Sequence, residues 1–73
     1  MAKDIGRQLG SRIRSLRQKH GLTQDELAQR SGISTKYLQN LEGKEPKRAS
    51  IDTLQGLADG FDMPLWKFLR FEE

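Results

Sequence analysis

The chain has 73 residues, which is room for one small domain with a modest core. It contains no cysteine and one histidine, which excludes a disulfide framework and a zinc site built from cysteines. No apolar run approaches the roughly 20 residues of a membrane span, and the first ten residues lack the apolar block of a signal peptide. We therefore expect a single cytoplasmic domain over residues 1–73, with no metal and no other cofactor.

The net charge is +3, but the charges are unevenly distributed. Residues 1–48 contain 11 Lys and Arg against 5 Asp and Glu, whereas residues 49–73 contain 2 against 5. A basic segment of this kind suits a polyanionic partner such as nucleic acid, although such charges can also simply solvate a helical surface. The acidic segment is expected to face away from a polyanion.

Apolar spacing and capping signals predict helices throughout and no strand. The first helix is expected over about 3–19, with Gly21 as its C-cap. Thr23 and Glu26 form a T-x-x-E capping box at the start of the second helix, which should end near Arg30. The stripe predicted for the buried side of the first helix consists of Ile5, Leu9, Ile13 and Leu16.

The remaining three helices are predicted from the same kinds of signal. Ser34 is expected to cap a third helix that runs to Leu41 or Glu42, and Ser50 to cap a fourth that Gly60 ends. Asp62 should cap a fifth helix, so that the last two helices span about 50–71. The stripe predicted for the buried side of the fourth helix consists of Ile51, Leu54, Leu57 and Ala58.

Residues 23–42 have the pattern of a helix-turn-helix. A steep crossing after a short turn needs a small residue at the crossing, which Ala28 supplies, and a permissive turn, which Gly32 supplies. The exposed side of the third helix then carries polar side chains that packing does not require, namely Thr35, Lys36, Gln39 and Asn40. This pattern predicts that the third helix enters the major groove of double-stranded DNA; the alternative is an ordinary helical hairpin.

Residues 22–69 resemble the Cro/repressor-type (Xre-like) helix-turn-helix domain. The resemblance is carried by LTQDELAQRSGIS, YLQNLEGKEPKRAS and IDTLQGLADGFDMPLWKFL. It implies an all-α, compact five-helix repressor-like fold and a transcriptional regulator that binds a specific DNA sequence. The loop departs from the family pattern, because the glycine of the usual E-x-G falls one place early at Gly43 and Ala49 stands where proline is common.

The resemblance also assigns base-reading positions to the third helix. Thr35, Lys36 and Asn40 match them. Lys36 suits guanine or a phosphate, and Asn40 suits adenine. Gln39 either joins these residues or faces away.

Contacts to the DNA backbone are implied elsewhere. Gln24 matches a glutamine that contacts a phosphate and buttresses the recognition helix, helped by the free N–H groups of the helix start. Lys47 and Arg48 match a phosphate-binding loop, with Lys44 as a further candidate. Tyr37 either packs over the turn or touches a phosphate or a thymine methyl.

Two further expectations concern an ion pair inside the domain and a homodimer interface. By resemblance, Arg17 and Glu42 form a partly buried ion pair that fixes the recognition helix. The last helix has too many apolar residues for one buried stripe. Trp66, Phe68 and Phe71 are therefore candidates for a homodimer interface suited to a palindromic operator; alternatively, all of them cover the core of one monomer.

The same residues bear on other functional classes. A protein-interaction module of this fold would present an acidic or apolar third helix. An antitoxin would combine DNA binding with a partner protein, a toxin, held by the fifth helix. Thr35, Lys36 and Asn40 argue against the purely protein-binding version. An enzyme is not expected, because the chain has no phosphate loop and no convincing carboxylate pair, and its one histidine, His20, is at the predicted end of the first helix.

Overall fold

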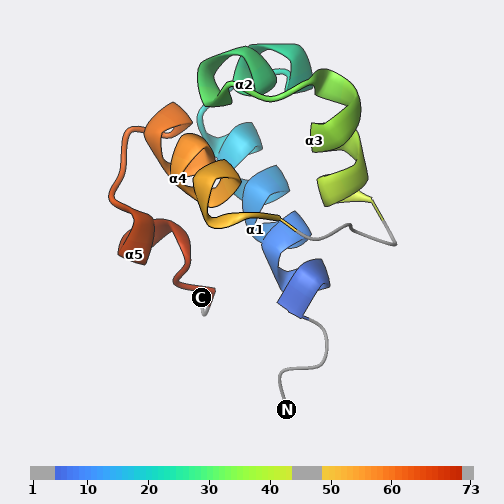
Figure 1. The fold of residues 1–73 in the computed structure, drawn as a ribbon. Helices are drawn as coiled ribbons and strands as arrows, with labels where there is room; N and C mark the ends of the chain where they lie inside the picture. Colours follow the sequence, from blue (N-terminus) through green and yellow to red (C-terminus); the bar gives the residue numbers. More distant parts are fainter. Residues whose placement is uncertain (1–4, 44–48, 72–73) are drawn as a thin grey trace.

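The computed structural model describes residues 5–43 and 49–71. These residues form helices and no strand, which confirms the expected all-α, five-helix architecture. Figure 1 shows α2 across one end of α1, α3 along one side of α1, and α4 and α5 on the other side. In chain order the helices are α1 Ile5–Lys19, α2 Gln24–Ser31, α3 Thr35–Glu42, α4 Ile51–Gly60 and α5 Leu65–Phe68.

The start of α2 confirms the predicted capping box. The backbone N–H of Glu26 donates to Thr23 Oγ1 at 3.1 Å, and the backbone N–H of Thr23 donates to Glu26 Oε1 at 2.9 Å. Ser34 and Ser50 cap α3 and α4 as expected, each accepting a hydrogen bond from the third residue after it. Local capping therefore determines where three of the helices begin.

The predicted role of Asp62 is wrong. Asp62 does not cap α5, whose N-cap is Pro64 without a side-chain hydrogen bond. Asp62 instead has a φ of 59° and follows the C-terminus of α4. The N–H of Met63 reaches back to the carbonyl of Ala58 at 3.0 Å, which completes the end of α4. Aspartate tolerates this left-handed conformation better than most residues.

Helix α5 is also shorter than predicted, since it ends at Phe68 and not near Phe71. The guanidinium of Arg12, on α1, takes the last carbonyls of this helix. Its Nε donates to Phe68 O at 2.9 Å and its Nη2 to Lys67 O at 2.7 Å. A long-range cap therefore replaces the further turn that the apolar run suggested.

One hydrophobic core joins all five helices, with α1 packed against α3 and α2 against α4. Ile5 and Ile51 were expected on buried stripes, but they are 53% and 71% exposed. Each is the first residue of its helix and projects beyond the core. The largest fully buried side chains are Ile13, Leu27, Leu38, Leu41, Leu57, Phe61 and Phe68.

Two close helix contacts explain glycines that otherwise weaken helices. A Cβ atom on Gly10 would lie 2.5 Å from Leu41 O, and one on Gly56 would lie 2.5 Å from Ser31 O. Gly10 therefore lets α1 approach the end of α3, and Gly56 lets α4 approach the end of α2. Together these contacts fix both helices of the predicted helix-turn-helix against the rest of the domain.

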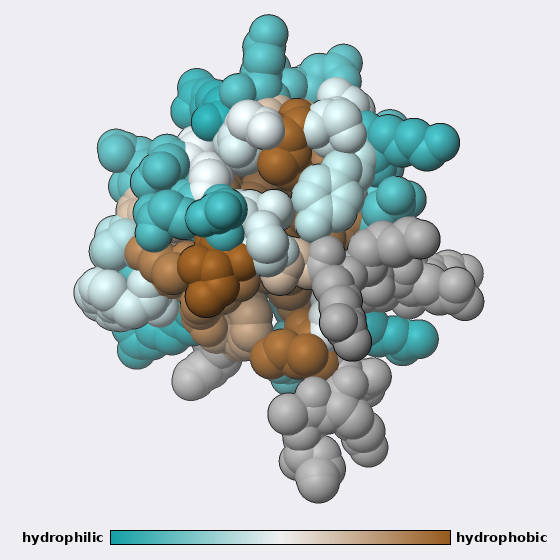
Figure 2. All heavy atoms as spheres, viewed as in Figure 1, coloured by the Kyte–Doolittle hydropathy of each residue, from teal (hydrophilic) through white to brown (hydrophobic). Residues whose placement is uncertain are grey.

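The surface seen in Figure 2 is largely polar, with apolar groups gathered over the side formed by α4 and α5. Within the described ranges, no helix combines the length and apolar character needed to cross a membrane.

Candidate nucleic-acid interface

The outer side of α3 presents polar side chains. Lys36 and Gln39 are exposed and Asn40 is half-buried, whereas Leu38 and Leu41 face the core. Positions three and four apart share one side of a helix, so the three polar residues stand together and Gln39 does not face the core. Their side chains make no hydrogen bond with another residue of 5–43 or 49–71. They are therefore free to donate to or accept from a ligand.

Thr35 differs from these three residues because its hydroxyl is already engaged. Thr35 is half-buried, and its Oγ1 donates to Asp25 Oδ1 at 2.7 Å. Asp25 lies in the first turn of α2, so this bond connects the starts of the two helices. Asp25 and Thr35 are ten positions apart, and no local sequence motif connects them, so Asp25 could not be found from the sequence alone.

The predicted ion pair between Arg17 and Glu42 is present and bidentate. Arg17 Nε donates to Glu42 Oε2 at 2.9 Å, and its Nη2 donates to Oε1 at 3.0 Å. Gln24 adds a third bond, from its Nε2 to Glu42 Oε1 at 3.1 Å. Glu42 is only 8% exposed, so a buried carboxylate holds the end of α3 to both α1 and α2.

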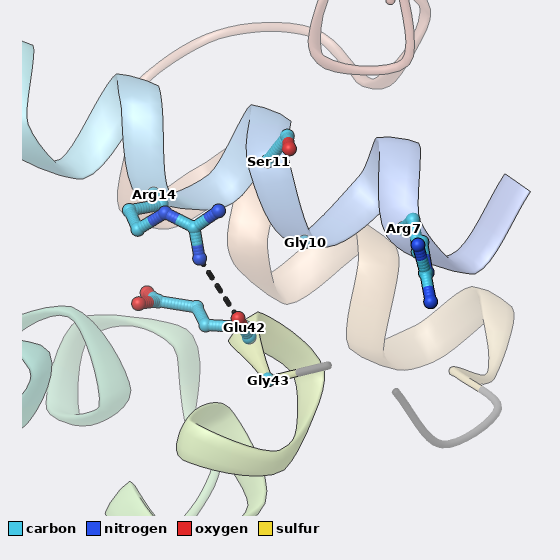
Figure 3. A pocket seen from close by; sticks show the side chains of 6 residues that line it. All are labelled: Arg7, Gly10, Ser11, Arg14, Glu42 and Gly43. Carbon is cyan, nitrogen blue, oxygen red and sulfur yellow. Dashed lines mark hydrogen bonds between the residues drawn. The ribbon is translucent and has the colours of Figure 1, made fainter. Parts of the chain in front are cut away.

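Arg14 supports the same end of α3 from another direction. Its Nη1 donates to the backbone carbonyl of Glu42 at 2.8 Å (Figure 3). A cation at a helix C-terminus satisfies a free carbonyl and interacts favourably with the helix dipole. Figure 3 also shows Arg7 and Arg14 directed from α1 toward the side where α3 ends. They border a shallow pocket of about 290 Å³, lined by Arg7, Gly10, Ser11, Arg14, Glu42 and Gly43.

A polar helix face that is held from behind by a buried network is the geometry of a DNA-reading helix. A protein-family model described as helix-turn-helix matches residues 13–65, which run from the middle of α1 into α5. The chain belongs to this helix-turn-helix family of DNA-binding transcriptional regulators.

Individual relatives agree with the family. The chain is 40% identical over 55 residues to y4dJ of Sinorhizobium fredii, an uncharacterized HTH-type transcriptional regulator, covering 75% of this chain and 70% of that protein. It is 43% identical over 58 residues to PF1851 of Pyrococcus furiosus, named provisionally as an HTH-type transcriptional regulatory protein. That match covers 80% of this chain but only 18% of PF1851, so the chain spans a small part of that relative's length.

A solved structure has the same fold. The restriction-modification controller protein C.AhdI from Aeromonas hydrophila superposes with a TM-score of 0.81 at 29% sequence identity. The superposition covers 90% of this chain and 97% of the controller protein. The resemblance to the Cro/repressor-type domain is thereby confirmed for nearly the full set of described helices.

Tyr37 and Gln24, which were predicted to contact DNA, both make contacts inside the domain. Tyr37 is half-buried and packs against the core, as one of its two expected roles required; a contact with DNA stays a prediction. Gln24 buttresses α3 through Glu42, and its contact with a phosphate stays a prediction. Lys44, Lys47 and Arg48 lie outside the described residues.

The aromatic residues of the C-terminal region divide into three cases. The prediction that Phe68 contributes to a dimer interface is wrong, because its side chain is fully buried and packs against Phe61 with ring centroids 6.0 Å apart. Phe71 is half-buried against the core. Trp66 is 67% exposed and remains the strongest of the three candidates.

Proposed function

We propose that this domain is a cytoplasmic transcriptional regulator, and not an enzyme, that binds a specific double-stranded DNA sequence as a homodimer. The observation that carries the proposal is the exposed side of α3, where Lys36, Gln39 and Asn40 stand together with no partner among the described residues. A positively charged group and two amides can hydrogen-bond to base edges in a major groove. The opposite side of α3 is buried and held through Glu42, so these groups are presented by a rigid helix.

Distinct residues are proposed to read bases and to position the protein. Lys36 suits the O6 and N7 acceptors of guanine, and Asn40 suits the N6 and N7 groups of adenine. Gln24 and the free N–H groups at the start of α2 suit a phosphate, since a helix N-terminus favours an anion. Phosphate contacts fix the register on the duplex, whereas contacts to base edges select the sequence.

Homodimer formation is proposed through the apolar surface near α5. Trp66 is 67% exposed, which is unusual for a tryptophan unless a partner or ligand covers it. A symmetric dimer would present two recognition helices about 34 Å apart, which matches one turn of DNA. The expected operator is therefore an inverted repeat with half-sites about ten base pairs apart.

The first experiment is selection of bound duplexes from a randomised DNA pool at near-physiological salt. Enrichment of an inverted repeat would support the whole proposal, whereas enrichment of one half-site would support DNA reading without the dimer. Background binding with no enriched sequence would contradict the proposed function.

A second candidate function rests on the same exposed apolar groups. Trp66 and Ile51, at 67% and 71% exposure, suit a protein partner as well as a second copy, and an antitoxin would bind DNA and a partner protein. Sedimentation equilibrium distinguishes these cases. We expect a concentration-dependent dimer that Trp66→Ala weakens at least about tenfold, because a central aromatic residue commonly contributes more than 1 kcal/mol to an interface. A chain that stays monomeric at all concentrations would favour a different protein partner.

A further inference from the structure

The hydrogen bond between Thr35 and Asp25 restricts what Thr35 can do at a base edge. Its length, 2.7 Å, is that of a short bond between a hydroxyl and a carboxylate. An ionised carboxylate has no hydrogen to give, so the shared proton must come from the threonine. The hydroxyl of Thr35 carries one proton, and that proton is directed at Asp25.

A hydroxyl whose proton is already used can only accept a further hydrogen bond. Thr35 is the first residue of α3, at the end of a recognition helix that contacts base edges. In the major groove the donors are the N6 amino group of adenine and the N4 amino group of cytosine, whereas guanine O6 and N7 and thymine O4 are acceptors. A threonine hydroxyl free of other bonds can serve with either kind.

We propose that Asp25 determines the base preference of Thr35: by holding the hydroxyl proton, it makes Thr35 select adenine or cytosine and disfavour guanine and thymine. This inference rests on the proposed function, because it concerns the DNA sequence that α3 reads. Asp25 is a positioning residue in this scheme, and Thr35 makes the contact.

The carboxylate adds to the discrimination in two ways. For Thr35 to donate to guanine or thymine, it must release Asp25 and break a charge-assisted bond, which is roughly twice as strong as a neutral one. The released carboxylate would then lie close to an acceptor-bearing base edge, with which it can form no hydrogen bond.

The test measures binding to a set of duplexes that carry each of the four base pairs at every half-site position. Wild-type protein is expected to prefer adenine or cytosine at one position by about tenfold, the value of one well-formed hydrogen bond. Asp25→Ala should reduce that preference to less than about threefold, because the freed hydroxyl can then donate as well as accept. Thr35→Val, which keeps the shape and removes the hydroxyl, should abolish the preference at the same position.

The double variant Asp25→Ala/Thr35→Val tests whether Asp25 acts through Thr35. It should show the same base preference as Thr35→Val alone. Asp52→Ala is the matched control, since Asp52 is also an exposed acid in the first turn of a helix. It changes the net charge equally and should alter affinity for all duplexes alike. Thermal melting establishes that each variant is folded, and Thr35→Ala replaces Thr35→Val if the valine variant is not.

Three results would overturn this inference and leave the proposed function standing. The first is a wild-type preference for guanine or thymine at the base pair that Thr35 contacts, and the second is an unchanged base preference in Asp25→Ala. The third is a base preference of the double variant that differs from that of Thr35→Val, because Asp25 would then act by another route than Thr35. Failure of wild-type protein to favour any DNA sequence would overturn the proposed function, and this inference with it.

Discussion

Helices α3 and α5 are both held by arginines of α1, but in different ways. The end of α3 is held through the buried side chain of Glu42, which Arg17 and Gln24 contact. The end of α5 is held through backbone carbonyls, which Arg12 contacts, and through the buried ring of Phe68. The first arrangement fixes an eight-residue helix at an angle set by side chains from two neighbours. The second only closes a four-residue helix over the core.

The difference shows how a functional helix can be positioned from its hidden side. On α3 the groups proposed to bind DNA are free because Glu42, at the opposite side, carries the contacts that orient the helix. On α5 the exposed group is Trp66, which lies on a helix of four residues. We therefore expect disruption at α3 to affect stability and DNA binding together, and disruption at α5 to affect mainly local stability and pairing.

The largest effect is expected for Glu42→Ala. It leaves the mostly buried guanidinium of Arg17 without its carboxylate, and removing one partner of a buried pair typically costs about 3 kcal/mol or more. Urea unfolding should show this loss, and DNA binding should weaken at temperatures where the variant is still folded. Asp52→Ala removes an exposed acid from the first turn of α4 and should lower the stability by less than about 1 kcal/mol. If Glu42→Ala behaves like the control, the buried network does not position α3.

The next effect concerns the outer side of α3. Lys36→Ala and Asn40→Ala should each reduce discrimination at particular base pairs by about 2 kcal/mol, if each makes a two-bond contact with a base. Unfolding should change little, because neither side chain has a partner among the described residues. Lys19→Ala removes the same charge from the end of α1 and should leave base preference intact. Equal behaviour of all three variants would show that α3 attracts DNA without reading it.

Arg12→Ala tests the second arrangement. The variant removes both guanidinium hydrogen bonds from the end of α5, and hydrogen bonds to a charged group contribute about 1.5 kcal/mol or more. The carbonyl of Lys67 keeps the backbone N–H of Arg70 at 3.2 Å. Unfolding should detect this loss, and hydrogen exchange should accelerate in α5 before it does in α3. Arg7→Ala removes an exposed arginine that makes no hydrogen bond with another described residue and serves as the control. Faster exchange in α3 than in α5 would contradict the separation of the two regions.

The sequence predicts features that depend on neighbouring residues. The starts of α2, α3 and α4 follow from N-cap residues that each accept a hydrogen bond from the third residue after them. The exposed side of α3 follows from helical periodicity. The pairing of Arg17 with Glu42 came from the family resemblance, since residues 25 positions apart share no local pattern. The error at Asp62 is instructive, because aspartate is common at helix starts and also tolerates the left-handed backbone that ends α4.

Features that depend on how helices meet could not be predicted in this way. Arg12 and Arg14 look alike in sequence, yet one caps α5 and the other caps α3 because they project from different sides of α1. Gly10 looks like a weak point in a helix until α3 is placed against it. The bond from Thr35 to Asp25 likewise requires the crossing angle of α2 and α3, which the spacing of apolar residues does not specify closely enough.

The smallest change in stability is expected for a substitution of Ser31, where the helix-turn-helix packs against α4. Ser31, at the end of α2, packs against α4, and its buried hydroxyl has no hydrogen-bond partner among residues 5–43 and 49–71. An unsatisfied buried hydroxyl is destabilising, and alanine is the better helix former, so Ser31→Ala should stabilise the domain by about 1 kcal/mol. Ser15→Ala, at an exposed position in α1, measures the helix-propensity contribution alone and should stabilise it by less. Thermal melting of the two variants decides the point. A smaller gain in stability for Ser31→Ala than for Ser15→Ala would mean that the Ser31 hydroxyl stabilises the contact of α2 with α4. That contact would then be held by a polar group, as the ends of α3 and α5 are.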